Sequence, residues 1–175
     1  MRGFSKWIAG LALAPSLAMA ADVTGVVTAV HDGASFVIDG QTEVKVFGID
    51  APDLAQRCRA DAIYEPGPAP CVPCGEHARR ALASLLEGKR VTCKDRGRSG
   101  AAITGECTQG KILVGPWMLS QGWAVVFEPP LERGERPVYF GAQNSAKRAS
   151  AGLWSTTFIP PAAWRDQKQR LACEK

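Results

Sequence analysis

The chain has 175 residues and a formal net charge of +4 at pH 7. That length fits one domain with a real hydrophobic core and excludes two domains of ordinary size. The small positive charge also argues against a protein that binds polyanions by charge alone, because nucleic-acid-binding domains usually carry a larger or more clustered basic excess.

The N-terminus is typical of a secretory signal peptide. Arg2 and Lys6 form its basic start, an apolar stretch runs from Trp7 to Leu17, and Ala18-Met19-Ala20 fits the small-x-small cleavage pattern. The apolar stretch is shorter than the roughly 20 residues that a membrane span needs. We therefore expect cleavage after residue 20 and export to the periplasm or the medium. Two of the four positive charges leave with the signal peptide, so the mature chain is only weakly basic and has no membrane span.

The six cysteines all follow this segment, and an even number in an exported chain favours disulfides. They are Cys58, Cys71, Cys74, Cys93, Cys107 and Cys173. Cys93 and Cys107 fall on two neighbouring predicted strands and are the expected pair. Cys58 can pair with either Cys71 or Cys74, and Cys173 can pair with the one that is left.

Two alternatives use the same cysteines. Cys71-Val72-Pro73-Cys74 precedes a helical pattern, as in redox motifs that lower a thiol pKa at a helix start. Cys58, Cys71, Cys74 and His77 also have a spacing that a zinc site can use. Disulfides are the preferred interpretation, because thiolates in an oxidising compartment are usually oxidised.

Three short segments rich in β-branched residues open the mature chain and predict a β-meander: Val23–Ala29, Ser35–Ile38 and Glu43–Phe47. In the third segment, Val44 and Val46 alternate with polar residues and are expected to point inward. A Pro- and Gly-rich loop follows from Gln56 to Pro73. The segment Gly75–Leu86 then has apolar residues at helical spacing and predicts an amphipathic helix that ends at Gly88.

Arg90–Cys93 and Ala102–Cys107 predict two more strands, joined by a Gly- and Arg-rich connector. The rest of the chain predicts two helices, an extended piece between them and a tail with one or two helical turns: 112–120, 138–151, 123–127 and 160 onward. Five strands with about three packed helices give an α+β domain whose strands can close as a Greek-key barrel of the OB-fold type. We assign residues 1–20 to the signal peptide, 21–165 to this domain and 166–175 to a C-terminal tail.

Several short motifs occur in a fixed order along this pattern: Val-His-Asp-Gly-Ala-Ser-Phe (30–36), Lys-Val-Phe-Gly-Ile-Asp-Ala-Pro-Asp (45–53), Cys-Gly-Glu-His-Ala (74–78), Gln-Gly-Trp-Ala (121–124) and Gly-Leu-Trp (152–154). In this order and spacing they resemble the staphylococcal nuclease (thermonuclease) family. The resemblance runs from about Val23 to Trp164 and implies an OB barrel with packed helices. Its most specific element is the Gly-Ile-Asp-Ala-Pro-Asp turn after the meander.

The family hydrolyses DNA and RNA with calcium, and the chemistry states what such a site needs. Carboxylates hold the cation, another carboxylate positions or deprotonates water, and arginines stabilise charge on the phosphorus. The resemblance implies that Asp50 is a calcium ligand, with Asp32 as a further candidate. It places Asp53 at the catalytic glutamate and Lys45 at the arginine of the third strand.

The sequence retains the calcium ligand Asp50 but departs from the family pattern at four other roles. Ala34 stands where a second calcium-binding aspartate is usual, and Asp53 is one methylene shorter than glutamate. Lys45 keeps its charge but lacks the planar fork that binds phosphate in two places. The second arginine is absent from Gly100-Ala101-Ala102, which leaves Arg96 and Arg98 as candidate phosphate-binding residues.

These departures predict an exported thermonuclease-like domain with weak or lost nuclease activity. It would bind single-stranded nucleic acid or another polyanion on the barrel face near Lys45, as a monomer. Trp117, Trp123, Phe127 and Trp154 have apolar neighbours in sequence and are expected in the core instead of stacking on bases.

Two alternatives stay open at this stage. One is an active calcium-dependent phosphodiesterase that cuts DNA or RNA through Asp50 and Asp53. The other is a cell-envelope interaction module that uses the loop Glu65–Pro73 or the segment Glu128–Pro137 for recognition.

Overall fold

The computed structural model describes residues 22–60 and 70–166. The expected signal peptide, loop residues 61–69 and most of the expected tail, with Cys173, lie outside the described residues. Within the described part of the chain, no helix is both long and apolar enough to cross a membrane.

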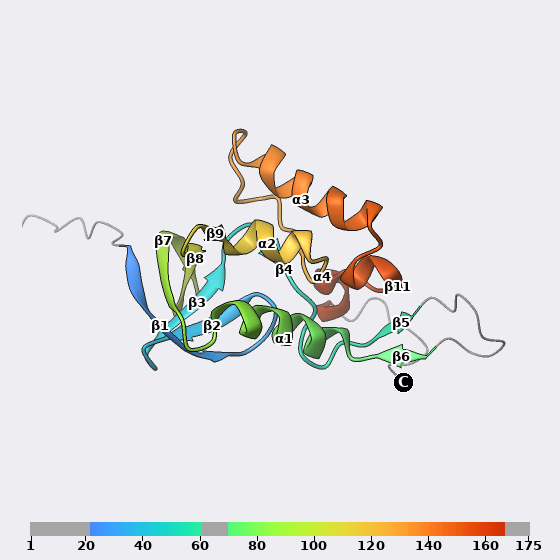
Figure 1. Ribbon diagram of the computed structural model, residues 1–175, viewed down its shortest axis with the longest axis horizontal. Helices are drawn as coiled ribbons and strands as arrows, with labels where there is room; N and C mark the ends of the chain where they lie inside the picture. Colours follow the sequence, from blue (N-terminus) through green and yellow to red (C-terminus); the bar gives the residue numbers. More distant parts are fainter. Residues whose placement is uncertain (1–21, 61–69, 167–175) are drawn as a thin grey trace, which may run out of the picture.

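Five strands form a closed barrel, at the left of Figure 1. Antiparallel pairing gives the order β3-β2-β1-β7-β8, and a parallel pairing between β3 and β8 closes the ring. This confirms the predicted five-stranded OB-fold barrel with packed helices. The strands are β1 (Val23–Val30), β2 (Ser35–Ile38), β3 (Thr42–Val46), β7 (Arg90–Ser99) and β8 (Ala102–Gln109).

Most of the other elements lie to one side of this barrel, at the right of Figure 1. Helix α2 lies between the barrel and α3, while α1 runs below the barrel (Figure 1). A small sheet of β11, β5 and β6 projects away from the barrel, and β10 pairs with β4 beside it. The helices are α1 (Cys74–Leu86), α2 (Val114–Ser120), α3 (Arg136–Arg148), α4 (Pro161–Arg165) and the 3₁₀ turn η1 (Gly152–Ser155). The short strands are β4 (Ile49–Asp50), β5 (Cys58–Ala60), β6 (Cys71–Val72), β9 (Ile112–Leu113), β10 (Val125–Val126) and β11 (Thr156–Thr157).

The core explains the periodicity of the sequence. Val44 and Val46 of β3 are buried, as their alternation predicts, while Lys45 between them is exposed. Helix α1 buries Leu82 and Leu86 in the same core, so the amphipathic helix was predicted correctly. The outward position of Lys45 places a cation on the barrel surface.

The hairpin of β7 and β8 is longer than the sequence indicated. Strand β7 was expected to end at Cys93, but it continues to Ser99. Its last residues pair with β8 across an irregularity, where Asp95 opposes Gly105 and Arg98 opposes Ile103. Such an irregularity bends a strand. The Gly- and Arg-rich composition of this segment predicted a connector instead of a strand. As a result, the expected connector is itself a twisted strand end.

The second helix is shorter than expected because β9 takes its first residues. Ile112 and Leu113 pair with the end of β8, so α2 begins only at Val114. Helix α3 begins two residues before its expected start and ends at Arg148. These shifts change the ends of the elements without changing their order.

Two of the family-like motifs meet backbone to backbone. A Cβ added at Gly122 would lie 2.1 Å from the carbonyl oxygen of Ala151, and one added at Gly152 would lie 2.6 Å from the oxygen of Gly122. Both glycines have positive φ angles, of 76° and 57°. Leu153 donates its N–H to the Gly122 oxygen at 2.9 Å. The motifs Gln-Gly-Trp-Ala and Gly-Leu-Trp therefore form a single packing contact.

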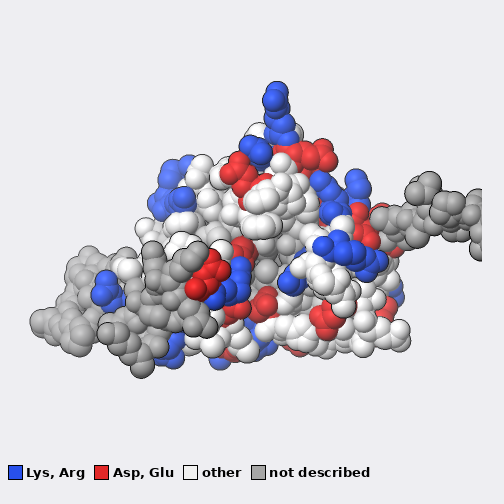
Figure 2. All heavy atoms as spheres, turned by 180° about the vertical axis from the view of Figure 1, so that it is seen from behind, with Lys and Arg blue, Asp and Glu red and all other residues white. Residues whose placement is uncertain are grey.

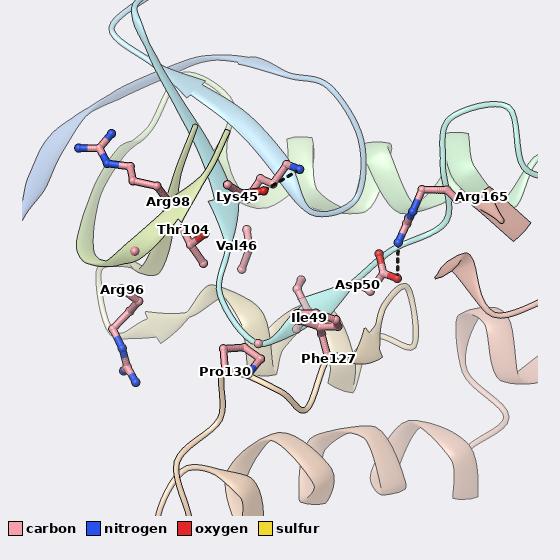
Figure 3. Close-up of a pocket in the computed structure, with 13 residues that line it drawn as sticks. Lys45, Val46, Ile49, Asp50, Arg96, Arg98, Thr104, Phe127, Pro130 and Arg165 are labelled. Atoms are coloured by element: carbon pink, nitrogen blue, oxygen red, sulfur yellow. Dashed lines mark hydrogen bonds and ion pairs between the residues drawn. The ribbon is translucent and has the colours of Figure 1, made fainter. Parts of the chain in front are cut away.

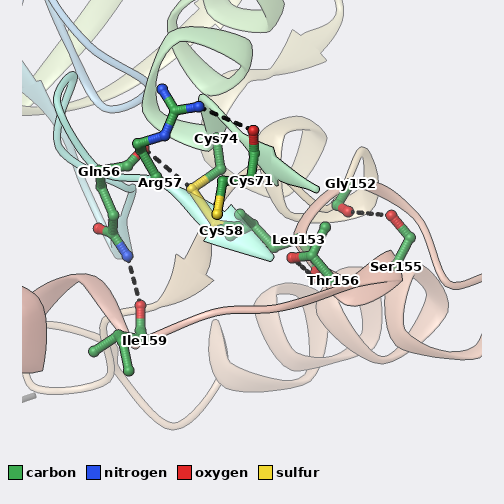
Figure 4. Close-up of a disulfide and its surroundings, with 10 residues drawn as sticks. All are labelled: Gln56, Arg57, Cys58, Cys71, Cys74, Gly152, Leu153, Ser155, Thr156 and Ile159. Carbon is green, nitrogen blue, oxygen red and sulfur yellow. Dashed lines mark hydrogen bonds between the residues drawn. A yellow bond between two sulfur atoms is a disulfide. The ribbon is translucent and has the colours of Figure 1, made fainter. Parts of the chain in front are cut away.

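Two disulfides are present in the described part of the chain, and Figure 4 shows the one between Cys58 and Cys74. Cys93 pairs with Cys107 across β7 and β8, as predicted, and Cys58 pairs with Cys74. The second bond consumes a sulfur that both the redox motif and the zinc site would need, so neither alternative is formed. Cys71 is not bonded within the described residues. Its pairing with Cys173 stays a prediction.

Candidate functional site

Two neighbouring cavities lie on the barrel face, where β3, β4 and the β7–β8 hairpin meet. Their volumes are about 430 Å³ and 230 Å³. Lys45, Asp50 and Arg165 line both, so these side chains stand where the cavities adjoin. Figure 3 shows Arg165 turned toward Asp50, and Arg98 on the far side of the hairpin. We call the larger cavity the groove and the smaller one the carboxylate pocket.

The carboxylate pocket contains the two acidic residues of the Asp-Ala-Pro-Asp turn. Asp50 ends β4, which pairs with β10, and Asp53 follows in a turn closed by a hydrogen bond from the Gln56 N–H to its carbonyl oxygen at 2.8 Å. The Asp50 side chain is 18% exposed and that of Asp53 is 35% exposed. The structure brings these two carboxylates into one pocket, and their expected roles stay predictions.

The guanidinium of Arg165, from α4, bridges both carboxylates. It donates to Oδ2 of Asp50 at 2.7 Å and to Oδ2 of Asp53 at 3.1 Å. These hydrogen bonds, that to Asp50 above all, raise the pKa of Arg165 above its usual value. An arginine that lies more than a hundred residues further along the chain therefore neutralises charge in this pocket.

Asp32 is the third carboxylate of the pocket, and it has a structural task. Its Oδ1 accepts the backbone N–H of Ala34 at 2.7 Å, which is the hydrogen bond of an Asx turn. Ala34 lines the pocket with a methyl group at the position where the family usually carries an aspartate. Asp32 thus closes the turn, but Ala34 has no side-chain oxygen that could bind a metal ion.

These residues do not fit a calcium ion. Calcium takes six to eight oxygen ligands, among them several carboxylates. Here Asp50 and Asp53 each give an oxygen to Arg165, and Ala34 offers none. Within residues 22–60 and 70–166, no cluster of three or more His, Cys, Asp or Glu side chains could hold a metal ion.

Lys45 and the tip of the hairpin form the wall of the groove. Lys45 Nζ donates to Ser99 Oγ at 3.1 Å, so the β3 side chain reaches across to β7. Ser99 opposes Ala102 in the hairpin, where the family resemblance predicts an arginine and none is present. Lys45 thus brings a cation to the end of the hairpin that lacks the arginine.

Arg96 and Arg98 differ in their freedom to bind a ligand. The Arg96 side chain is 14% exposed and donates to Glu135 at 2.6 Å and to Glu106 at 2.8 Å. It also lies 4.1 Å from the centre of the Phe47 ring. Arg98 is 64% exposed, and its nearest carboxylate is 3.6 Å away. We therefore keep Arg98, and leave Arg96 out, as a phosphate-binding candidate.

The Arg96 cluster leads to a stability prediction. Replacing Arg96 by alanine leaves two acidic side chains, Glu106 and Glu135, unpaired at exposures of only 22% and 21%. We expect a loss of about 2 kcal/mol in the free energy of unfolding, since breaking a buried ion pair costs more than an exposed one. Arg98→Ala is the matched control, expected within about 0.5 kcal/mol of the parent. Urea unfolding followed by tryptophan fluorescence measures both, and equal losses would contradict the assignment.

The same cluster contributes a pH dependence. Arg96, by its hydrogen bond above all, lowers the pKa of Glu135 below its usual 4.5. Because this pKa is lower in the folded than in the unfolded protein, the ionised Glu135 stabilises the fold at pH values above 4.5. The stabilisation is lost as the pH falls through the lowered pKa of the folded state. Arg96→Ala should therefore lose less stability on acidification than the parent.

Four aromatic residues were predicted to lie in the core, and the structure has three of them partly buried and one exposed. Trp117 and Trp123 pack on the main core, and Trp154 contacts Phe158 edge to face. Phe127, by contrast, is 47% exposed and lines the groove. The core prediction is wrong for Phe127, because it follows the end of the short strand β10 and lies at the groove instead of in the core.

Comparison with known proteins reveals the relationship. The profile of the family described as staphylococcal nuclease homologue matches residues 43–156. The chain belongs to this family. No curated protein matches the sequence. The match covers β3, the Asp-Ala-Pro-Asp turn, α1, the β7–β8 hairpin and α3, so family membership and the closed barrel support each other.

Sequence reasoning missed Arg165. It falls just before the expected tail, in a segment with no pattern that points to a site, and only the fold of α4 brings it to Asp50. One signal was available. The family's site needs arginines, and the barrel positions where they usually stand carry none here, so an arginine from elsewhere in the chain could have been sought. The family profile ends at residue 156, before α4, so it carries no signal for this contact either.

Proposed function

We propose that this nuclease-family protein is exported and binds single-stranded nucleic acid in the groove, with weak or lost hydrolysis. The observation that carries the proposal is the bridging of Asp50 and Asp53 by Arg165. The two carboxylates that the family resemblance assigns to calcium and to water are both engaged by a side chain of the protein.

Weak hydrolysis follows from the remaining residues of the site. Asp53 is one methylene shorter than glutamate, and an error of about 1 Å in position can cost about a hundredfold in rate. Losing one preorganised charge-stabilising group costs about 100- to 1,000-fold. With Ala34 and Lys45 also replacing family residues, efficient transition-state stabilisation has no apparent source.

Binding is supported by the charge and shape of the groove. Apart from Arg96, which Glu106 and Glu135 hold, three basic side chains and one acidic side chain line it: Lys45, Arg98, Arg165 and Asp50. Lysine and arginine atoms stand on both sides of a hollow in Figure 2, interspersed with acidic atoms. Cationic side chains spaced along the groove suit an extended polyanion such as a nucleic-acid backbone. The exposed Phe127 ring offers a surface on which a base can stack.

Export is supported by two observations. The two disulfides suit an oxidising compartment, and the N-terminal sequence has the basic, apolar and small-residue segments of a signal peptide. An N-terminal sequence of the protein recovered from the periplasm or medium that begins at Ala21 would support export. Retention of the whole sequence in the cytoplasm would contradict it.

Fluorescence anisotropy with a labelled oligo-dT strand tests the binding, with chelator present. The affinity should fall with increasing salt, with a log–log slope of about −2 for three phosphate contacts on a single strand. An uncharged peptide nucleic acid of the same bases is the control and should not bind. Absence of binding to oligo-dT even at low salt would contradict the proposed function.

A further inference from the structure

Arg165 reaches the carboxylate pocket from a distant part of the sequence. It belongs to the last turn of α4, and its hydrogen-bond partners are 115 and 112 residues earlier in the sequence. The pocket has three acidic side chains, Asp32, Asp50 and Asp53, against two basic ones, Lys45 and Arg165. Without Arg165, three carboxylates would face a single lysine. Arg165 is therefore the main counter-charge of Asp50 and Asp53.

The bridging geometry leaves part of the guanidinium unused. A guanidinium has five N–H donors in a planar fork, and two of them are directed to Asp50 and Asp53. The Arg165 side chain is 44% exposed and lines the groove as well as the pocket. Donors that do not face the carboxylates can therefore be reached by a ligand in the groove.

A divalent cation in a phosphodiesterase site does two things. It holds carboxylates together, and it binds an oxygen of the phosphate. A guanidinium can do both by hydrogen bonding, because it pairs with carboxylates and with phosphate through the same planar fork. It lacks the coordination and Lewis acidity that activate water, so it supports binding without supporting hydrolysis.

We propose that Arg165 takes the place of a divalent cation, holding Asp50 and Asp53 together and binding a phosphate group of the nucleic acid in the groove. This inference rests on the proposed function. Lys45, which also lines both cavities, supplies a second cation for the same phosphate or the next one. Binding of nucleic acid is then independent of metal ions.

The test compares the parent protein with Arg165→Gln, using labelled oligo-dT in chelator and in millimolar calcium. The parent should bind equally in both. Arg165→Gln should bind at least about tenfold more weakly in chelator, because a charge-assisted contact to phosphate is lost. Calcium should restore part of that affinity, since the freed carboxylates can hold a cation against the phosphate. Arg165→Gln combined with Asp50→Asn should not be restored.

Arg148→Gln, at the exposed end of α3, is the control for the loss of one charge. Parent binding that requires calcium would overturn the inference, as would unchanged affinity of Arg165→Gln in chelator. If calcium does not raise the affinity of Arg165→Gln for oligo-dT, the inference that the guanidinium takes the place of a cation is overturned.

The proposed function can fail separately, if the parent does not bind oligo-dT at all. Terbium luminescence then decides the inference, with saturable terbium binding expected for Arg165→Gln and none for the parent. Equal terbium binding by both proteins would overturn it.

Discussion

Reversing the charge of Lys45 and Arg98 together should reduce affinity for oligo-dT by at least about 100-fold at low salt. Both side chains are exposed and line the groove, and the one carboxylate near Arg98, that of Asp95, is 3.6 Å away. Lys45→Glu, Arg98→Glu removes two phosphate contacts and adds two repulsive charges. The salt dependence should also flatten, because fewer counterions are released on binding. Anisotropy titrations at several salt concentrations measure both effects.

The control separates a local effect from a change in net charge. Lys111→Glu, Arg148→Glu changes net charge by the same amount at two exposed positions that do not line the groove. At about 0.1 M salt its affinity should stay within about threefold of the parent, because the Debye length there is about 10 Å and charges farther from the ligand are largely screened. Equal losses in both double variants would mean that binding is nonspecific and not in the groove.

Replacing Gly75 by alanine should lower the free energy of unfolding by about 3 kcal/mol. A Cβ at this position would lie 1.8 Å from the carbonyl oxygen of Asp53 and 2.8 Å from that of Leu54. The helix cannot easily retreat, because the neighbouring Cys74 is bonded to Cys58. The clash is with backbone, so rotation of a side chain cannot relieve it. Urea unfolding measures the loss.

Gly141→Ala is the matched control. Gly141 is exposed on α3, and an added Cβ there meets nothing within 4 Å. This variant should be more stable than the parent by about 0.5–1 kcal/mol, because alanine favours a helix. A Gly75→Ala protein as stable as the parent would show that α1 and the Asp53 segment do not pack as closely as the structure has them.

The barrel was predictable because its residues repeat simple local rules. Val44 and Val46 alternate with polar neighbours, and Gly88 ends an amphipathic helix, so each pattern needs only a short window of sequence. The order of five strands then matched an OB-fold. The extra length of β7 was not predictable in this way, because a Gly-Arg segment has little strand propensity and is ordered by pairing with β8.

The candidate site was predictable only in part. Asp50 and Asp53 follow a recognisable turn and were placed together from the motif. The fates of Arg96 and Arg165 depend on tertiary contacts. Glu135, which holds Arg96, lies 39 residues further along the chain, and Asp50 precedes Arg165 by 115. No local pattern encodes such partners, so sequence named Arg96 as a phosphate-binding candidate and passed over Arg165.

Cleavage of single-stranded DNA and RNA by the purified mature chain, with calcium or with chelator, tests the account most directly. We predict no calcium-dependent cleavage above that of an Asp50→Ala control, because Arg165 bridges the two carboxylates and Ala34 removes a third. Cleavage that requires calcium and disappears in the Asp50→Ala variant would contradict the account and identify the protein as an active calcium-dependent phosphodiesterase.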